Sequence, residues 1–363
     1  MSKITYKSNK LTCHPDETLL DALLREKIDV PYSCKAGSCH TCLMRSSDNN
    51  PPVKAQEGLK PTQKQQNYFL ACLCKPDQDM TISLADEANQ FITKGTVISK
   101  QKLNNDIVEL KLECCDRFDF NPGQFVNLKK PDGVSRSYSI ANIPNKNNVI
   151  EFHIRNLPDG QFSEWVHNEL CTGDQIPLSE AKGNCFYIPE RQEQGLLLIG
   201  TGSGLAPLAG ILKDALKQKH TGPIHLVHGS SHKEGLYWVD VMKALSEQYS
   251  NFHYTACVSG DENPEGYTQG RANEVALKTI SDLKAWRVYL CGHPEMVEQT
   301  KKQAFLQGAS IQDIYADAFY VKTHHDNESD QQDKVIDPVN LDEINLKLTE
   351  GLSSTGEYTR QSP

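Results

Sequence analysis

The sequence lacks an excess of basic residues, and its first ten residues contain little that is apolar. Its formal net charge is −9 over 363 residues, which argues against sequence-independent binding to nucleic acid, because that polyanion attracts basic surfaces. Residues 1–10 are polar and charged, with no apolar segment of signal-peptide type. We therefore expect a cytoplasmic protein whose 12 cysteines are reduced, and such cysteines more often serve metal sites than disulfides. No internal repeat is found.

Long hydrophobic runs are also missing, with one exception. The uncharged segment 195–212, GLLLIGTGSGLAPLAGIL, is nearly long enough for a short spanning helix. Five glycines and Pro207 would disrupt such a helix. A buried strand, a glycine turn and a helix start explain the segment better, so we expect no membrane span.

Most of the negative charge lies near the C-terminus. Residues 323–363 contain nine acids and three bases, and therefore carry −6 of the total charge of −9. Apolar periodicity also fades there, which is typical of segments that cannot bury a core. We expect an acidic, disordered tail.

Four cysteines have the spacing of an iron–sulfur site. Cys34, Cys39 and Cys42 follow a C-x4-C-x2-C pattern, and Cys72 comes much later, in YFLACLC. Plant-type 2Fe–2S clusters use this arrangement of three close cysteines and one distant cysteine. Structural zinc usually takes two close pairs instead. The pattern therefore favours a dinuclear cluster over zinc.

The cysteine loop and its lead-in, ETLLDALLREKIDVPYSC, resemble the ferredoxin domain in reductases of bacterial oxygenases. Cys74 is an alternative fourth ligand, but the spacing in that family favours Cys72. His40 stands where the family usually carries a small residue. We interpret His40 as an exposed loop residue rather than a ligand, one that would alter hydrogen bonding to the sulfurs and hence the potential.

Periodicity divides the chain into three structured units, which together predict a multidomain α+β and α/β fold. Residues 1–90 predict a β-grasp sheet crossed by a helix, beginning with two strands around an Asn-Lys turn and ending in the polar linker 86–90. Residues 91–192 contain short alternating strands separated by turn signals, which indicate an antiparallel barrel. Residues 193–322 alternate apolar strands with helical stretches, which indicate a doubly wound parallel sheet.

The second unit contains the tetrapeptide Arg136-Ser137-Tyr138-Ser139 between GQFVNL and EFHIRN. In this context it resembles the flavin-binding barrel of the ferredoxin–NADP reductase superfamily. The resemblance implies that Arg136 pairs with flavin phosphate, for which a guanidinium is suited. It places Tyr138 against the flavin ring and Ser139 near the reactive edge. It also implies FAD, although one branch of the superfamily uses FMN.

The third unit contains a glycine turn, GTGSGLAP, and the later turn CGHPEM. The first departs from the G-x-G-x-x-G fingerprint and instead resembles the nucleotide-binding turn of the same superfamily. The second resembles that superfamily's C-G-x-P-x-M turn, whose cysteine lies beside the nicotinamide. Taken together, the resemblance implies cofactor contacts at Arg136, Ser137, Tyr138, Ser139, His153, Ile154, Arg155, Gly160, Ser163, Gly200, Thr201, Gly202, Gly204, Pro207, Cys291, Gly292 and Phe319.

The choice of pyridine nucleotide depends on charge. A site for the 2′-phosphate of NADPH usually presents Arg or Lys, whereas Asp261 and Glu262 follow the strand HYTACVSG here. Lys233 is the only counterargument that we identify, and we interpret it as a solvated loop residue. We therefore expect NADH rather than NADPH.

The order of the three resemblances predicts the reaction. Benzoate dioxygenase, methane monooxygenase and phenol hydroxylase reductases have a similar order. It implies that electrons pass from NADH to FAD, then to the 2Fe–2S cluster, and then to a partner oxygenase or hydroxylase, because flavin converts hydride transfer into single-electron steps. Ser139 and Cys291 would lie beside the reacting atoms, without an acid–base dyad. A reductase for a deoxysugar dehydrase and a flavin/iron–sulfur redox sensor remain alternatives.

Overall fold

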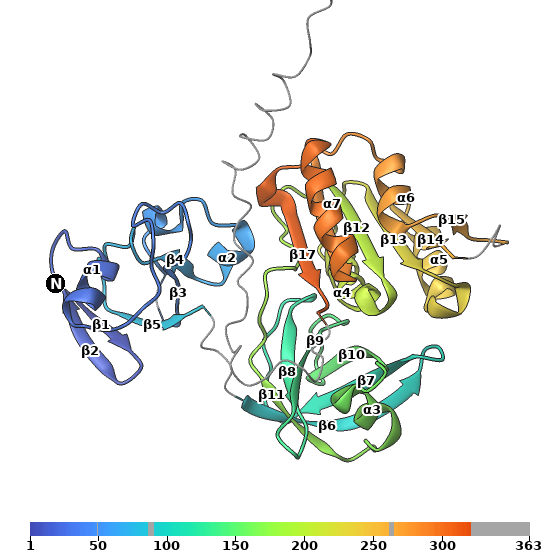
Figure 1. Ribbon diagram of the computed structural model, residues 1–363, viewed down its shortest axis with the longest axis horizontal. Helices are drawn as coiled ribbons and strands as arrows, with labels where there is room; N and C mark the ends of the chain where they lie inside the picture. The colour runs from blue at the N-terminus through green and yellow to red at the C-terminus, as the bar shows by residue number, and fades with distance from the viewer. Residues whose placement is uncertain (49, 86–90, 261–264, 321–363) are drawn as a thin grey trace, which may run out of the picture.

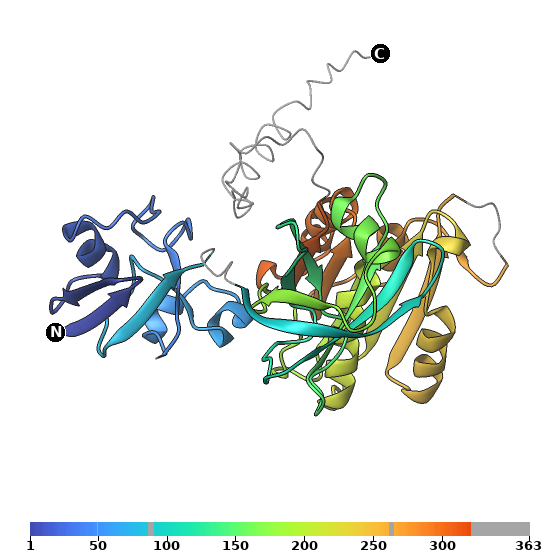
Figure 2. The same ribbon diagram turned by 90° about the horizontal axis from the view of Figure 1, so that it is seen from below.

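The computed structural model describes residues 1–48, 50–85, 91–260 and 265–320. The expected linker 86–90, the acids Asp261 and Glu262, and the expected tail 323–363 lie outside the described residues. The rest forms three sheets, and the unit built on the first sheet lies to one side of the other two (Figure 1, Figure 2). The three-part multidomain fold expected from the sequence is confirmed.

The first unit is a five-stranded mixed sheet, in the order β2-β1-β5-β3-β4, with α1 packed against it. Thr18 caps α1, because its side chain accepts a hydrogen bond from the Asp21 amide. The first hairpin turns at Lys7 and Ser8, before the expected Asn-Lys pair, because Asn9 already pairs with Tyr6. The elements are β1 (Ser2–Tyr6), β2 (Asn9–Cys13), α1 (Leu19–Arg25), β3 (Leu43–Ser46), η1 (Val53–Gln56), α2 (Pro61–Gln65), β4 (Tyr68–Leu70) and β5 (Met80–Leu84).

The second unit is a six-stranded antiparallel sheet, in the order β10-β7-β6-β11-β8-β9. A bridge between Ile140 and Phe152 joins the chain after β9 to β10, so the two edges of the sheet meet and the expected barrel closes. Its elements are β6 (Phe91–Lys102), β7 (Ile107–Cys114), β8 (Phe125–Lys129), β9 (Ser135–Ser139), β10 (Val149–Arg155), α3 (Gln161–Asn168) and β11 (Gln175–Ser179).

The third unit is a six-stranded parallel sheet, in the order β15-β14-β13-β12-β16-β17, flanked by helices. The segment tested as a membrane span forms β12, a one-turn helix and the start of α4, as expected. Its elements are β12 (Gly195–Thr201), η2 (Gly202–Gly204), α4 (Leu205–Lys217), β13 (Ile224–Ser230), η3 (Lys233–Gly235), α5 (Val239–Gln248), β14 (Phe252–Val258), β15 (Thr268–Gln269), α6 (Ala272–Thr279), β16 (Trp286–Gly292), α7 (Pro294–Leu306), η4 (Ile311–Asp313) and β17 (Ile314–Ala318).

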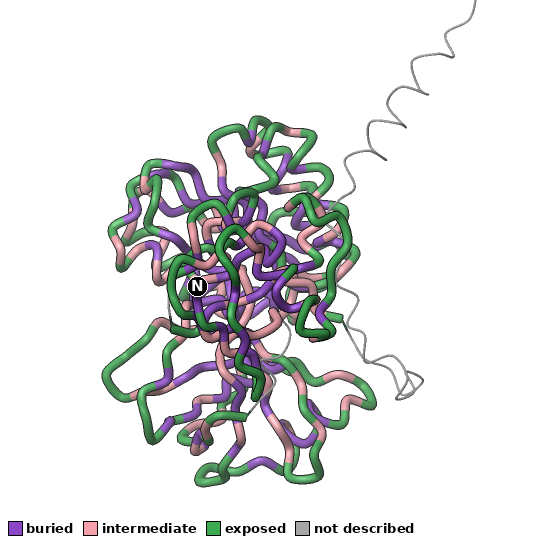
Figure 3. Tube along the Cα trace, turned by 90° about the vertical axis from the view of Figure 1, so that its left-hand side faces the viewer, coloured by how far each residue is buried: buried purple, intermediate pink, exposed green. Residues whose placement is uncertain are grey.

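The buried residues gather in the interior of the molecule, and the exposed residues lie on its outer turns (Figure 3). The second and third units share a hydrophobic cluster, in which Ile107 and Cys185 pack with residues of α4 and β12. The first unit has a separate cluster made only of its own residues. Among the described residues, no helix has the length and apolarity needed to cross a bilayer.

Candidate functional site

The loop between α1 and β3 brings the predicted cluster cysteines together in two pairs. The Cys34 amide donates a hydrogen bond to Cys39 Sγ, and the Cys39 amide donates one to Cys34 Sγ, both at 3.4 Å. Cys42, directly before β3, interacts through its side chain with Cys72, which follows β4. The antiparallel pairing of β3 with β4 holds this second pair in place.

The paired thiols fit a dinuclear cluster better than a single metal ion. Sulfurs bound tetrahedrally to one zinc lie about 3.8 Å apart, given Zn–S bonds of about 2.3 Å. Within the described residues, no three cysteine sulfurs lie within 4.8 Å of one another. Two thiols for each of two irons match this arrangement.

The ionisation of the thiols also fits a metal site. The amides of Ala36 and Cys39 donate hydrogen bonds to Cys34 Sγ and lower the pKa of Cys34 to about 6. Burial raises the pKa of Cys42 to about 12, so a bound cation is needed to hold Cys42 as thiolate.

Two further residues of this region, Cys74 and His40, have surroundings of their own. Cys74 is fully buried in the core of the first unit, and burial raises its pKa to about 12. Besides burial, the groups that raise the pKa of Cys74 are Cys13 and Asp77, and none of the four predicted cluster cysteines is among them. His40 is half-buried in a left-handed conformation, with φ 57°, rather than exposed as expected, and burial lowers its pKa.

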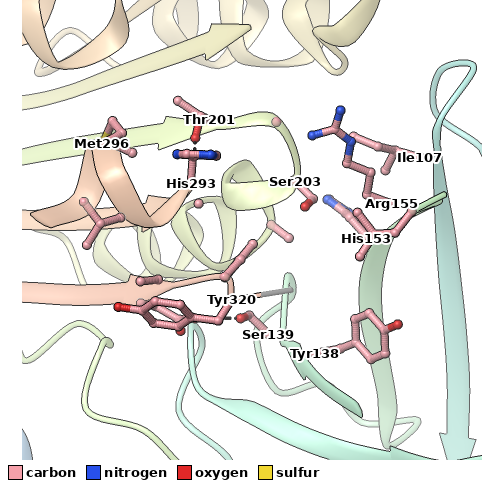
Figure 4. Close-up of a pocket in the computed structure, with 18 of the residues that line it drawn as sticks. Ile107, Tyr138, Ser139, His153, Arg155, Thr201, Ser203, His293, Met296 and Tyr320 are labelled. Atoms are coloured by element: carbon pink, nitrogen blue, oxygen red, sulfur yellow. Dashed lines mark hydrogen bonds between the residues drawn. The ribbon is translucent and has the colours of Figure 1, made fainter. Parts of the chain in front are cut away.

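A second site is a cavity of about 1750 Å³ between the barrel and the parallel sheet. Figure 4 shows Tyr138, His153 and Arg155 on the barrel side and Thr201, Ser203 and His293 on the other. Of the expected cofactor contacts, the cavity is lined by Arg136, Ser137, Tyr138, Ser139, His153, Arg155, Gly160, Ser163, Thr201, Gly202, Gly292 and Phe319. The residues Ile154, Gly200, Gly204, Pro207 and Cys291 do not line it.

The barrel wall of this cavity is built from β9, β10 and the start of α3. The Tyr138 ring packs on Phe162, with ring centroids 5.3 Å apart, and so presents a fixed aromatic surface. Ser163 braces the turn before α3, because its hydroxyl accepts from the Leu157 amide and donates to the Gly160 carbonyl, each at 3.1 Å. A phosphate at this turn would therefore meet a fixed backbone.

The other wall depends on close backbone approach. A Cβ on Gly204 would lie 2.3 Å from the Cys291 carbonyl oxygen. Gly292 has φ +121°, and a Cβ there would lie 2.5 Å from Thr201 Oγ1, which accepts a hydrogen bond from the His293 amide at 3.0 Å. The glycines thus let the turn after β12 and the turn after β16 meet and leave an open cradle for a nucleotide.

Cys291 lies behind this cradle. Its thiol is fully buried, and its Sγ lies 3.8 Å from Cys185 Sγ. Burial raises the pKa of Cys291 well above the ordinary value. Its contact with nicotinamide stays a prediction.

His153 is held by a buried polar network. Its Nδ1 lies 2.9 Å from the Tyr237 hydroxyl and its Nε2 lies 3.2 Å from Glu151 Oε1, so its ring nitrogens are engaged within the protein. Burial lowers the pKa of His153. Glu109, Glu151 and His153 are close enough to hold a metal ion, but Lys111 pairs with both carboxylates, at 2.7 and 3.5 Å.

Sequence reasoning missed Asp317. The Ser139 hydroxyl donates a 2.8 Å hydrogen bond to Asp317 Oδ2, and Asp317 also lines the cavity. Burial raises the pKa of Asp317 to about 6. The strand IYADA carries no local mark of this role, because an acid in an alternating strand ordinarily faces water. Arg271 and Tyr320 also line the cavity and were not expected there.

The cavity fits two cofactors. Its volume exceeds the roughly 300–1000 Å³ of an ordinary ligand pocket. It combines an aromatic wall, arginines at 136 and 155, and a glycine cradle at a helix start. A flavin on the barrel wall and a nicotinamide nucleotide on the glycine wall would meet beside Ser139.

Three family models match successive parts of the chain. A 2Fe-2S iron–sulfur cluster binding domain matches residues 3–77. An oxidoreductase FAD-binding domain matches residues 94–187, and an oxidoreductase NAD-binding domain matches residues 198–302. All three expected cofactors, 2Fe–2S, FAD and a pyridine nucleotide, therefore have a matching domain.

The chain also aligns with relatives over most of their own length. The chain is 33% identical over 309 residues to the ferredoxin–NAD(P)+ reductase component of a Pseudomonas putida naphthalene 1,2-dioxygenase system, covering 83% of this chain and 93% of the relative. It is 30% identical to terephthalate 1,2-dioxygenase reductase component 2 of Comamonas sp., covering 85% and 93%. A solved ferredoxin reductase in carbazole 1,9a-dioxygenase superposes with TM-score 0.59 at 25% identity, covering 88% and 98%.

Proposed function

The chain belongs to the ferredoxin–NAD(P)+ reductase components of oxygenase systems, and on that premise we propose that it passes electrons from NADH to a partner oxygenase or hydroxylase. One observation carries the proposal: a single cavity is lined by both the Arg136–Ser139 strand and the glycine turn after β12. A hydride donor and a flavin bound to these two walls would lie next to each other. The relatives favour this function over a dehydrase reductase or a redox sensor.

We assign the cofactor-binding roles as follows. Arg136 and Arg155 would bind phosphate oxygens of FAD, and Tyr138 would cover its ring. Thr201, Gly202 and Gly292 would bind the nucleotide through their backbone, and Ser139 would lie beside the reacting atoms. Cys34, Cys39, Cys42 and Cys72 would ligate the 2Fe–2S cluster. When bound, flavin accepts a hydride and gives up its electrons singly.

Proton movement is the chemical task left to the protein. The Ser139 hydroxyl is placed to exchange a proton with the reactive edge of the flavin. Asp317 accepts that hydroxyl's hydrogen bond and, with a pKa of about 6, is mostly ionised at pH 7. It can therefore take up the proton that flavin reoxidation releases. The cavity walls would position the reactants.

Several finer points belong to the proposal. We propose unit boundaries at 1–90, 91–192 and 193–322, with an acidic tail from 323. NADH is the preferred donor because Asp261 and Glu262 would repel a 2′-phosphate. A cytoplasmic location is supported by the cysteines, all of which are free thiols, the state that a reducing compartment maintains.

The test is a comparison of donors and acceptors with the full chain, reconstituted with iron, sulfide and FAD. We expect NADH to reduce the flavin with a higher kcat/KM than NADPH. A purified oxygenase component should then accept electrons only from the protein that carries a cluster. Equal transfer by protein lacking the cluster would refute the proposed route.

A further inference from the structure

The first unit is joined to the other two by polar contacts. No hydrophobic cluster of the described residues spans this junction, whereas the barrel and the parallel sheet share one. Two units joined in this way resemble a transient interface more than a common core. The position of the cluster-bearing unit therefore depends on a few identifiable side chains.

Lys60 is central to this junction. It precedes α2, which lies next to β17 in Figure 1. Its ammonium donates a hydrogen bond to the Ile314 carbonyl and lies 4.9 Å from the centroid of the Tyr315 ring. Burial, together with the nearby Lys301, lowers the pKa of Lys60 to about 8, and the Asp313 carboxylate opposes this lowering. At pH 7 the side chain is therefore a largely desolvated cation held by a carbonyl dipole and an aromatic face.

Other polar contacts surround Lys60. Gln312 donates to the Gly58 carbonyl at 3.0 Å. Gln66 donates to the Gly183 carbonyl at 3.2 Å and to Asn184 Oδ1 at 3.0 Å. Arg45 pairs with Glu180 at 3.3 Å.

These contacts connect directly to the proposed redox sites. Arg45 is on β3, three residues after Cys42, a separation of about 10 Å along a strand. On the other side, β17 carries Tyr315 at the junction and, two residues later, Asp317 beside Ser139 in the cavity. One rigid strand on each side thus links the junction to a redox site.

We propose that Lys60 is a positioning residue that docks the cluster-bearing unit on β17 and thereby sets the rate of electron transfer from the flavin cavity to the cluster. This inference rests on the proposed function. Each NADH delivers two electrons and one proton as hydride. In the docked position the cluster would take the two electrons one at a time and pass each to the one-electron acceptor, while the proton would leave to solvent. Docking controls only the electron steps.

The test is Lys60→Glu in the full chain loaded with FAD and cluster, with Lys64→Glu as the matched control. Lys64 is on α2, the helix that Lys60 precedes, its side chain is exposed, and the change in charge is identical. A carboxylate at position 60 would face Asp313, the Ile314 carbonyl and the Tyr315 ring, which repel it. Lys301 is the cation that would attract it. Anaerobic stopped-flow absorption follows flavin reduction by NADH, and freeze-quench electron paramagnetic resonance follows cluster reduction.

We expect Lys60→Glu to leave flavin reduction unchanged and to slow cluster reduction at least about tenfold, the effect of about 1.4 kcal/mol. Lys64→Glu should leave both rates unchanged. Cluster reduction at the wild-type rate in Lys60→Glu would overturn the proposal. Failure of NADH to reduce the flavin in the wild-type protein would instead refute the proposed function.

If the Lys60→Glu variant does not assemble its cluster, exchanging the charges of the Arg45–Glu180 pair provides a second test of the junction. Arg45→Glu and Glu180→Arg should each slow cluster reduction about two- to fivefold, because this pair is only partly buried. The double variant should recover the wild-type rate. If the two single variants and the double variant all reduced the cluster at the same rate, the proposal would be overturned.

Discussion

Ser139 and Asp317 lie 178 residues apart in the sequence, yet the Ser139 hydroxyl donates a 2.8 Å hydrogen bond to the Asp317 carboxylate. Ser139 ends β9 of the barrel, and Asp317 lies on β17 at the edge of the parallel sheet. The bond therefore crosses from the flavin wall to the nucleotide unit. It provides a proton acceptor at the place where the two cofactors would meet.

Replacement of Asp317 tests this assignment. Asp317→Asn keeps the size of the side chain but removes the proton acceptor, and we expect electron transfer from NADH to a one-electron acceptor to slow about 100-fold. Burial raises the pKa of Asp317 to about 6, so the wild-type rate should rise with pH through about 6 as the carboxylate ionises. The variant should lack that rise. Steady-state rates from pH 5 to 8 measure both effects, with the exposed Asp240→Asn as control.

The fourth cluster ligand can be decided by paired substitutions. Cys72 interacts with Cys42, whereas Cys74 is packed in the core. Cys72→Ser should lose the cluster or change its resonance spectrum. Cys74→Ala should keep two irons and two sulfides per chain and lower the free energy of unfolding by about 1 kcal/mol. Iron and sulfide analysis checks both, and the opposite pattern would assign the ligand to Cys74.

Substitution of Gly292 in the glycine cradle should weaken nucleotide binding, whereas backbone strain at a glycine outside the cradle should not. Gly292→Ala would combine a φ of +121° with contacts of 2.5 and 2.7 Å to Thr201, and should raise the KM for NADH and reduce stability by about 2–4 kcal/mol. Gly173 has φ +97° but open space around it, so Gly173→Ala should cost about 1 kcal/mol and leave KM unchanged. An equal KM in both variants would contradict the cradle.

The buried network at His153 predicts a dependence of stability on pH. Burial acts to raise the pKa of Glu151, but His153, Lys213 and Lys111 outweigh it and the pKa is lowered. A lowered pKa stabilises the folded state above the ordinary value of 4.5, and this stabilisation is lost as the pH falls below it. The Glu151→Gln variant should unfold at a lower temperature than the wild type at pH 7. Its unfolding temperature should also fall less than that of the wild type as the pH is lowered to 4. A melting curve that depends on pH as in the wild type would exclude this role.

Local patterns predicted the three units because each kind of sheet leaves its own period in the sequence. The glycine turn after β12 and the Arg136–Ser139 strand were recognised from short motifs, and the cavity includes both. Asp317 and Lys60 were not predicted. Both belong to segments with ordinary polar residues, and their partners, Ser139 and Tyr315, become neighbours only when distant strands pack.

The most direct test of the account is an anaerobic titration of the reconstituted protein with NADH, followed by absorption and electron paramagnetic resonance on the same samples. The account predicts that the flavin band bleaches and that a rhombic signal of the reduced 2Fe–2S cluster grows as NADH is added. Bleaching of the flavin with a cluster that stays oxidised and silent would contradict electron transfer between the two sites within this chain.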